Sequence, residues 1–490
     1  MEEGQLCSPL NPNGNDRTRE NFSPSSLTTT CSRSFWAESK AIWSIAGAAI
    51  VSRIATSGLT VITQAFVGHI GDLELAAFSL VVGLIVGFDS GILIGMGNAL
   101  GTLCGQAFGA NKHHMLGIYL QRSWLVLMGF AVLLLPLFLF TTPILRFLGQ
   151  SKDVAQLSGR VALWCIPFHF SFPFYFAIQR YLISQRKNII IAWSAAVGTI
   201  VSVLLNWLFV LKWNMGIDGA LASLDIGWWI PAIIQFLYVT CGGCPLTWTG
   251  FSREAFYELW PFIKLSFASG VMLCLEIWYY RILVLMTGQI KNTEVIVNSL
   301  TICLNINDWE LSIPLGFLVA TSVRVANQLG ARNPRGAKFS ILVSTVYSSL
   351  VGIMILVLLL VFRGHLGYLF TNSTAVQEAV AKLAILLACT IILNSVQPVL
   401  IGVAVGLGKQ YLVAYVNIIC YYFIGLPFGL ILGFVFHLSI MGIWVGMICG
   451  TAIQTIVLIF ITWRTNWEKE VIQINHQVTT MSSIESFPEE

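Results

Sequence analysis

Residues 123–145 read SWLVLMGFAVLLLPLFLFTTPIL, a stretch of 23 residues without a single charge. An α-helix needs about 20 mostly apolar residues to cross the ~30 Å hydrocarbon core of a bilayer. The run is far too long for a strand, and in lipid only helices and closed barrels satisfy all their backbone hydrogen bonds. This stretch therefore predicts a membrane-spanning helix.

Equivalent apolar runs recur along the chain of 490 residues, of which 56% are hydrophobic and 10% are charged. An ordinary soluble domain contains about 25% charged residues. Reading between the charged or turn-rich breaks predicts twelve spans, at residues 41–67, 76–103, 119–149, 157–181, 190–212, 218–240, 262–288, 294–327, 338–371, 376–406, 411–436 and 438–463. We therefore expect an all-α polytopic membrane protein with twelve transmembrane helices.

The two ends of the chain lack such runs. Residues 1–35 are rich in Ser, Thr, Asn and Pro, so they predict a disordered tail rather than a signal peptide. Residues 468–490 predict a second disordered tail. Lys and Arg concentrate in both tails and in alternate loops, as Lys112 and Arg332 do. Because these residues favour the cytosolic side of a membrane, both termini are predicted to be cytosolic.

Three pairs of short segments repeat in the same order in the two halves of the chain. The pairs are Gly68–Leu80 with Gly288–Leu300, Gln106–Asn111 with Asn327–Arg332, and Gly216–Gly219 with Ser439–Gly442. An even number of spans separates the copies, so both halves have the same orientation. The sequence therefore predicts two pseudo-symmetric six-helix lobes related by an axis along the membrane normal.

The repeat also sets the expected domain boundaries. We predict a first lobe at residues 36–240, a cytosolic linker at 241–261 and a second lobe at 262–467. Transporters built from such repeats bind their substrate near the bilayer midplane between the repeats. A substrate cleft is therefore expected between the two lobes.

Ionisable groups inside spans are candidate functional residues, because each costs about 2.5–3.5 kcal/mol at the bilayer centre on insertion scales. The groups placed within predicted spans are Arg53, Asp89, Asp225, Glu276, Arg281, Asp308 and Glu310. Arg53 could instead form a fixed ion pair with Asp89 or Asp225. Asp308 and Glu310 could face the cavity or merely bond across helices.

Glu276 has no counter-charge on its own helix face. Arg281 follows five residues later, about 140° round the helix, whereas Tyr280 shares the face of Glu276 and can form a hydrogen bond to it. A dry environment favours the uncharged form of a carboxyl group. We predict that Glu276 carries a proton; the alternative is a permanently protonated packing residue.

Three further residues within spans have a polar group and an ordinary packing interpretation. His169 lies between Pro167 and Pro173, each of which frees a backbone carbonyl, so a hydrogen bond from His169 to such a carbonyl is expected. Trp278 and Tyr279 could line a cavity for flat organic molecules, or could pack against helices or lipid.

Several classes of function are excluded. A net charge of +4 without a basic cluster argues against nucleic-acid binding. The chain has no phosphate-binding loop for ATP and no catalytic motif or long loop of an enzyme. The CxxC motif at Cys241 and Cys244 lacks the second half of a zinc site, so no metal or cofactor is expected. The expected partners are a small organic solute, protons and the lipid bilayer, and we expect a monomer.

Six segments together carry a family resemblance. They are QAFGA from Gln106, LQRSW from Leu120, CGGCPLTWTGFS from Cys241, GVMLCLEIWYYRILVLMTG from Gly270, VRVAN from Val323 and NSVQPVLIGVAVG from Asn394. Over residues 35–467 the chain resembles plant multidrug and toxic compound extrusion (MATE) transporters, in particular the DETOXIFICATION proteins similar to the transparent-testa flavonoid carrier. The resemblance implies two lobes that open alternately to the two sides. It also implies proton-coupled antiport of flavonoids, alkaloids or other metabolites out of the cytosol, across the vacuolar rather than the plasma membrane.

The resemblance assigns roles to individual residues. The family's acid on the seventh helix matches Glu276, and its partner on the tenth helix, an Asp in several relatives, is Asn394 here. Tyr280, Asn394 and Gln397 are therefore expected to tune Glu276.

Two positions in the second span depart from the family pattern. The family commonly has Glu near the end of this span, where this chain has Gly101, and Asp89 stands where a small neutral residue is expected. The departure suggests that an acid has moved to the midplane of the first lobe.

Two hypotheses follow. The first is a proton-driven antiporter in which Glu276 carries the proton. The alternative is a passive anion channel or uniporter of the vacuolar membrane, motivated by Arg53 and Arg281 within spans and by the missing second acid.

Overall fold

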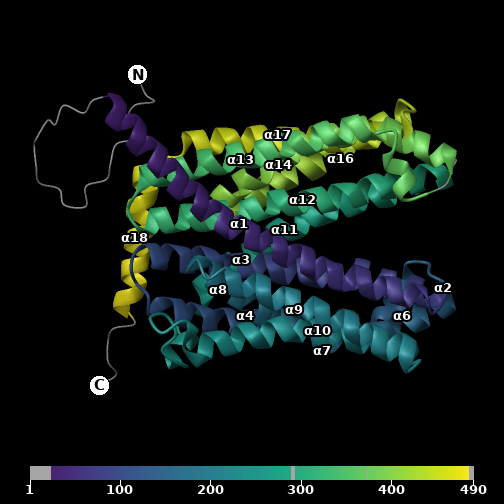
Figure 1. Ribbon diagram of the computed structural model, residues 1–490, viewed down its shortest axis with the longest axis horizontal. Helices are drawn as coiled ribbons and strands as arrows, with labels where there is room; N and C mark the ends of the chain where they lie inside the picture. The colour runs from purple at the N-terminus through teal and green to yellow at the C-terminus, as the bar shows by residue number, and fades with distance from the viewer. Residues whose placement is uncertain (1–23, 288–292, 372, 485–490) are drawn as a thin grey trace, which may run out of the picture.

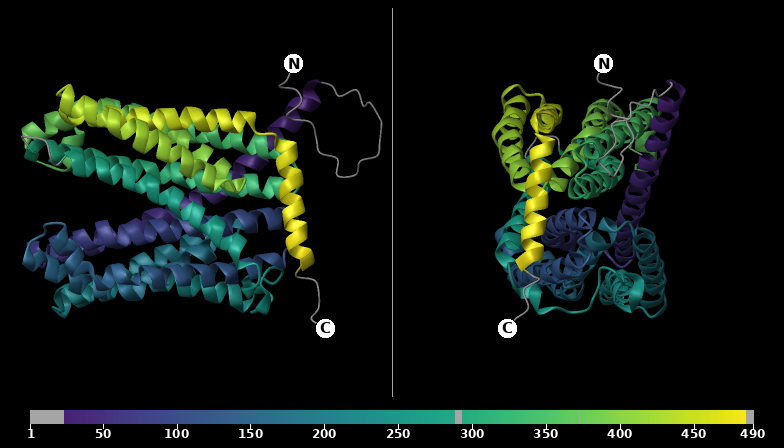
Figure 2. Two further views of the ribbon diagram at one scale, coloured as in Figure 1. Left: turned by 180° about the vertical axis from the view of Figure 1, so that it is seen from behind. Right: turned by 90° about the vertical axis from the view of Figure 1, so that its left-hand side faces the viewer.

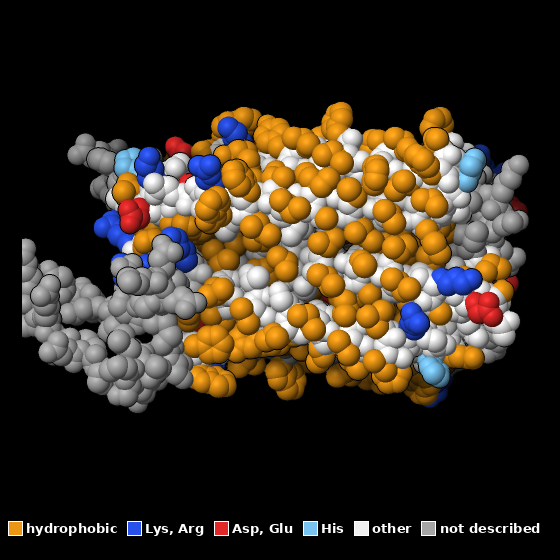
Figure 3. Space-filling model, turned by 90° about the horizontal axis from the view of Figure 1, so that it is seen from above, with side chains coloured by type: hydrophobic (Ala, Val, Ile, Leu, Met, Phe, Trp, Pro, Cys, Tyr) orange, Lys and Arg blue, Asp and Glu red, His pale blue; other side chains and the backbone are white. Residues whose placement is uncertain are grey.

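The chain is all-helical wherever its structure is described. The computed structural model describes residues 24–287, 293–371 and 373–484, and the regular elements in these ranges are all helices. Eleven helices are long and apolar enough to cross a membrane, and the bent pair Lys152–Trp164 and Ile166–Ser184 makes a twelfth span when counted as one. Hydrophobic side chains cover a broad band between two ends where charged side chains gather (Figure 3). The prediction of an all-α polytopic membrane protein is confirmed.

The first lobe contains six spans. Its elements are α1 (Pro24–Gly68), α2 (Asp72–Leu80), the π-helical turn η2 (Val81–Val86), α3 (Gly87–Gly109), α4 (Met115–Leu139), α5 (Thr141–Phe147), α6 (Lys152–Trp164), α7 (Ile166–His169), α8 (Ser171–Ser184), α9 (Ile189–Asn206), η3 (Trp207–Lys212) and α10 (Gly216–Tyr238). The fourth span bends by 47° between Trp164 and Ile166. Pro167 and Pro173 follow the bend, and each removes a backbone donor from the helix.

The second lobe repeats this arrangement. After η4 (Val239–Gly243) and η5 (Arg253–Phe256) come α11 (Leu259–Thr287), α12 (Thr293–Gly330), α13 (Pro334–Phe362), η6 (Leu366–Leu369), α14 (Thr374–Gly406), α15 (Gln410–Asn417), η7 (Ile418–Gly425), α16 (Leu426–Leu430), η8 (Ile431–Val435) and α17 (Ser439–Arg464). Figures 1 and 2 show the two lobes as two bundles that converge at the end where α18 lies and diverge toward the other end. We call the converging end the sealed end.

Helix α1 crosses from one lobe to the other (Figure 1). Near its start, Glu38 forms a buried ion pair with Arg324 of α12 at 2.5 Å and accepts a hydrogen bond from Ser340 of α13 at 2.6 Å. Further along, the carbonyl of Ala55 accepts a hydrogen bond from Thr199 of α9. The first part of α1 therefore packs on the second lobe, which the predicted boundary at residue 36 does not capture.

Both predicted tails are partly helical, which corrects the expectation of disorder. Helix α1 already begins at Pro24, a residue type suited to the first turn of a helix because it needs no N–H partner there. Residues 1–23 lie outside the described part of the chain.

At the other end of the chain, α18 spans Trp467–Ile484. Val471, Ile474 and Val478 recur at helical spacing and are buried, and this single apolar face holds the helix on the bundle. Helix α18 lies across the ends of both lobes (Figure 2). Its Met481 accepts a hydrogen bond from Tyr119 of the first lobe, and its Asn475 donates to the Leu329 carbonyl of the second lobe at 3.0 Å.

The internal repeat is visible in the backbone. Asn111 and Arg332, which end the second pair of segments, both have positive φ, 58° and 56°. Gly216 and Ser439, which begin the third pair of segments, have φ of 62° and 54°. These two pairs confirm the duplication. The first pair includes residues 288–292, which lie outside the described residues.

The copies of the second repeated pair also touch each other at the sealed end. A Cβ on Gly330 would overlap the carbonyl oxygen of Gln106, and a Cβ on Gly109 would overlap that of Asn327. The contact is therefore reciprocal, as expected for two lobes related by a twofold axis. In addition, Thr102 Oγ1 donates to the Val405 carbonyl at 2.8 Å. We call the reciprocal contact of Gly109 and Gly330 the latch.

Candidate functional site

Glu276 lies on α11 in the second lobe with a half-buried side chain. Its Oε1 accepts a hydrogen bond from Nε2 of Gln397 on α14 at 3.0 Å. No cation forms an ion pair with this carboxylate among the residues that the structure describes. The described partner of the Glu276 carboxylate is therefore uncharged, and it comes from α14.

Gln397 connects Glu276 to a polar network in the interior of the second lobe. Its Nε2 also lies 3.3 Å from the Tyr421 hydroxyl and 3.1 Å from Oε1 of Gln454. Tyr421 donates to Gln454 at 2.6 Å, and Gln454 donates to Asn417 at 2.6 Å. Asn417 then donates to the Met272 carbonyl, one turn before Glu276 on α11. The network thus starts and ends on the same helix.

The aromatic residues next to Glu276 have different roles. Tyr279 is fully buried and stacks on Tyr421, with ring centroids 4.2 Å apart and planes at 5°, so it packs inside the lobe. Trp278 is half-buried and makes an edge contact with Phe88 of α3 at 5.9 Å, which places it between the lobes. Tyr280 forms a hydrogen bond with Thr451 of α17.

Asn394 contacts a different acid from the one expected. Its Nδ2 donates to Oε2 of Glu310 at 3.2 Å and to Oδ1 of Asn307 at 3.1 Å, both on α12. Asn394 lies three residues before Gln397 on α14; its side chain contacts α12, whereas that of Gln397 contacts α11. Asn394 therefore does not contact Glu276 directly, and its expected tuning role stays a prediction. Glu310 bonds across helices and is 5% exposed.

Asp89 pairs with His169, which corrects the proposed pairing of Arg53. Asp89 Oδ2 lies 2.8 Å from His169 Nδ1, and both side chains are fully buried. His169 Nε2 lies 3.0 Å from the Ala131 carbonyl on α4, so its acceptor is a backbone carbonyl but not one of those that Pro167 and Pro173 free. Because a carbonyl only accepts, Nε2 carries a proton, and the Asp89–His169 contact shares one further proton. The pair is therefore neutral overall.

Asp225 also has a hydrogen-bond partner within the first lobe. Its Oδ1 accepts the backbone N–H of Phe168 at 3.2 Å, in the first turn of α7. A carboxylate at a helix N-terminus satisfies a free N–H and stabilises the helix dipole. Asp225 thus stabilises the bend of the fourth span and does not pair with Arg53.

The His169→Leu substitution is expected to lower stability by about 3–5 kcal/mol, because it leaves the buried Asp89 carboxyl without its partner. Asp89→Asn keeps a hydrogen bond, since the amide can donate to Nδ1, and is expected to cost much less. Thermal unfolding of the detergent-solubilised protein measures both. Equal unfolding temperatures for the two variants would contradict the neutral-pair interpretation.

Arg53, Arg281 and Asp308 come together in the structure. All three side chains are exposed in the described structure, although they lie within spans. Asp308 lies within electrostatic range of both Arg281 and Arg53. Arg180 on α8, which the sequence reasoning missed, lies within the same range of Arg53. Its position at the end of the predicted fourth span was the available signal.

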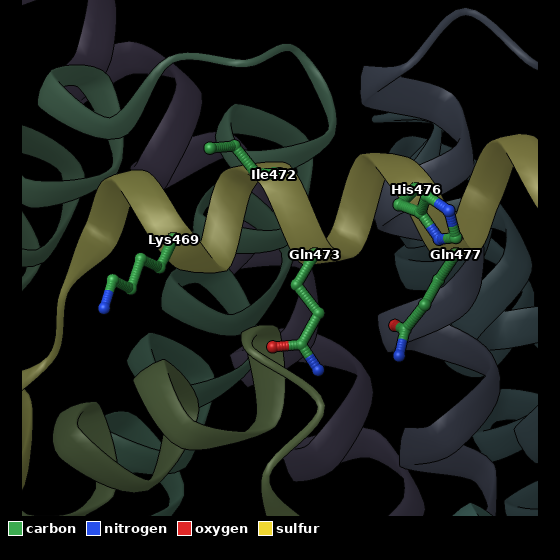
Figure 4. Close-up of a pocket in the computed structure, with 5 residues that line it drawn as sticks. All are labelled: Lys469, Ile472, Gln473, His476 and Gln477. Atoms are coloured by element: carbon green, nitrogen blue, oxygen red, sulfur yellow. The ribbon is translucent and has the colours of Figure 1, made fainter.

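A surface hollow also occurs on α18, where it is lined by Lys469, Ile472, Gln473, His476 and Gln477 (Figure 4). It belongs to one helix at the sealed end and includes none of the intramembrane charges. We therefore define the candidate site by Glu276, Gln397 and the network behind them, and by the charges between the lobes.

Two lobes of membrane-spanning helices with polar groups in their interior define a polytopic membrane transporter. The MatE family model matches residues 48–208 and 268–431. Protein DETOXIFICATION 27 of Arabidopsis thaliana is 54% identical over 447 residues, covering 91% of this chain and 92% of the relative. Protein DETOXIFICATION 28 of the same organism is 52% identical over 439 residues, covering 89% of each chain. The chain belongs to the MATE family of transporters and is an integral multi-pass membrane protein.

Solved structures agree with this assignment. The eukaryotic MATE transporter AtDTX14 matches with a TM-score of 0.86 at 31% identity, covering 91% of this chain and all of that one (100%). The Vibrio cholerae MATE transporter VcmN in its bent form shares the fold, with a TM-score of 0.74 at 18% identity over 90% of this chain and 99% of that one.

Proposed function

We propose that this transporter is a proton-coupled antiporter that moves organic solutes out of the cytosol by alternating access, with Glu276 as the proton carrier. We place it in the vacuolar membrane with both termini in the cytosol. The sealed end, where α18 lies, is then the cytosolic end, and the conformation described here is closed toward the cytosol.

The observation that carries this proposal is the uncharged environment of the Glu276 carboxylate. A carboxylate fixed by a Lys or Arg would stay ionised, whereas Gln397 offers an amide that can accept as well as donate. The group can therefore gain and lose a proton without leaving a partner charge unpaired in the membrane.

Protonation of Glu276 would act on several helices at once. The network behind it joins α11 and α14 to Tyr421 in η7, Gln454 in α17 and Asn417 in α15. When the carboxyl group becomes a donor, the Gln397 amide must reorient, and the hydroxyl and amides behind it must follow. A change of this kind biases an element between two packings, which is what alternating access requires.

Uptake into proteoliposomes tests this proposal. With an acidic interior, we expect uptake of the cationic dye ethidium or of a neutral flavonoid to rise well above the rate without a gradient, and to fall back when an ionophore dissipates the gradient. An equal uptake rate with and without the pH gradient would contradict proton coupling.

The passive anion channel remains the second candidate, because Arg53 and Arg281 are exposed within spans. Asp308 partly offsets both charges, which weakens this candidate. Voltage-clamp recording separates the two functions. A channel gives large currents that reverse at the chloride potential, whereas a carrier does not.

A further inference from the structure

Arg53 lies on a polar face of α1 that is distinct from the apolar exposed face of this helix. Ser57, Thr60 and Gln64 follow Arg53 at spacings of four, three and four residues, which places all four on one side of the helix. The apolar residues Val51, Ile54 and Val61, between 42% and 51% exposed, lie on another side. The apolar side suits lipid, and the polar side turns Arg53 toward the bundle interior.

Arg53 and Arg180 form a pair of like charges on the wall of the first lobe. Arg180 lies within electrostatic range of Arg53 and packs its stem over Gly101, where a Cβ would be 3.5 Å from its Cδ. Gly101 has no side chain, so α3 supplies no carboxylate at this point. Neither guanidinium makes an ion pair within the ranges that the structure describes.

The groups beside these arginines are uncharged. Gln179 Nε2 donates to Ser52 Oγ at 3.0 Å, and Ser52 lies 3.0 Å from the Tyr175 hydroxyl. Gln179 precedes Arg180 on α8 and Ser52 precedes Arg53 on α1. These contacts fix α1 against α8 next to the two arginines, and they provide hydrogen bonds without negative charge.

The balance of charge between the lobes is positive. The guanidiniums of Arg53, Arg180 and Arg281 face one nearby carboxylate, Asp308, which lies close to Arg53 and Arg281. Arg180 has no described acidic neighbour. Two guanidiniums within electrostatic range of each other inside a membrane are unfavourable unless an anion joins them, and their planar donors match the two oxygens of a carboxylate or sulfonate.

We propose that Arg53 and Arg180 form an anion subsite, and that the transported solutes include aromatic organic anions. This inference rests on the proposed antiport but concerns a different part of the molecule. The anion binds the first lobe, whereas the proton binds Glu276 in the second. Ser52, Tyr175 and Gln179 are positioning residues that hold α1 against α8 next to the two arginines.

Two matched probes test the subsite. Carboxyfluorescein, an aromatic anion, and ethidium, an aromatic cation, are compared in proteoliposomes with an acidic interior. We expect Arg53→Gln and Arg180→Gln each to reduce the ratio of carboxyfluorescein uptake to ethidium uptake roughly tenfold or more. Arg180→Lys keeps the charge but loses the planar donors, so it should restore only part of the anion uptake. Arg363→Gln, at an exposed helix end, is the control and should leave it unchanged.

A binding assay separates this inference from the proposed function. Fluorescence anisotropy of carboxyfluorescein with the detergent-solubilised full chain needs no pH gradient. Binding lost in both Gln variants but partly kept by Arg180→Lys supports the subsite even if proton coupling fails. Equal affinity in all variants, or pH-driven uptake of ethidium without carboxyfluorescein, would overturn it.

Discussion

The Glu276→Gln substitution is expected to abolish uptake driven by a pH gradient and to bring the rate down to that measured without a gradient. Gln has almost the same size as Glu and can still pair with Gln397, so the fold should persist. It cannot release a proton, so the coupling should be lost. Proteoliposome uptake with and without an acidic interior measures the difference.

The matched control for this substitution is Glu378→Gln, because Glu378 is exposed near the start of α14, about 28 Å along the helix from Gln397. We expect its uptake to equal that of the unaltered protein. Undiminished uptake by Glu276→Gln would contradict the role given to this residue. Loss of uptake in both variants would show that any removed carboxylate suffices, which also contradicts it.

The Gly330→Ala substitution is expected to separate the lobes at the sealed end. Its Cβ would overlap the Gln106 carbonyl oxygen, and a backbone atom cannot move aside as a flexible side chain can. Overpacking typically costs about 1–3 kcal/mol. Here it removes the closed state itself, so we expect a lower unfolding temperature and a loss of uptake of tenfold or more.

Two further variants make this prediction specific to the latch. Gly109→Ala should behave in the same way, because its Cβ would meet the Asn327 carbonyl in the reciprocal contact. Gly129→Ala, in the interior of α4, has no atom within 4 Å of its Cβ. It should leave transport unchanged and add up to ~1 kcal/mol of helix stability. Similar results for Gly330→Ala and Gly129→Ala would contradict the latch.

The spans could be predicted from the sequence because each must present an apolar surface to lipid over its whole length. Helix α18 escaped this reasoning because only one of its faces is apolar, with Val471, Ile474 and Val478 buried among polar neighbours. A hydropathy reading averages the two faces. A search for residues at spacings of three and four would have found it.

The partners of the intramembrane charges could not be predicted in the same way. Asp89 and His169 are 80 residues apart on α3 and α7, and their contact depends on how each helix is rotated. Rotation is set by packing, which a single sequence does not report. The same limit explains why Asn394 was assigned to Glu276 although it bonds Glu310. Gln397, three residues further along α14, does contact Glu276.

The internal repeat was more informative than the single charged residues, because it predicts that two segments occupy equivalent positions in the two lobes. The matched segments at Gln106 and Asn327 proved to be in direct contact with each other. A twofold relation brings equivalent residues together wherever they lie near the axis. The weak sequence match therefore marked the point at which the two lobes close.

The central claim is that solute movement is coupled to a proton carried by Glu276. The most direct measurement is proton movement driven by solute alone, followed with a pH-sensitive dye inside proteoliposomes that start without a pH gradient. We predict that an imposed solute gradient moves protons in the opposite direction through the unaltered protein and moves none through Glu276→Gln. Solute flux without proton movement, or equal proton movement in both proteins, would contradict the account.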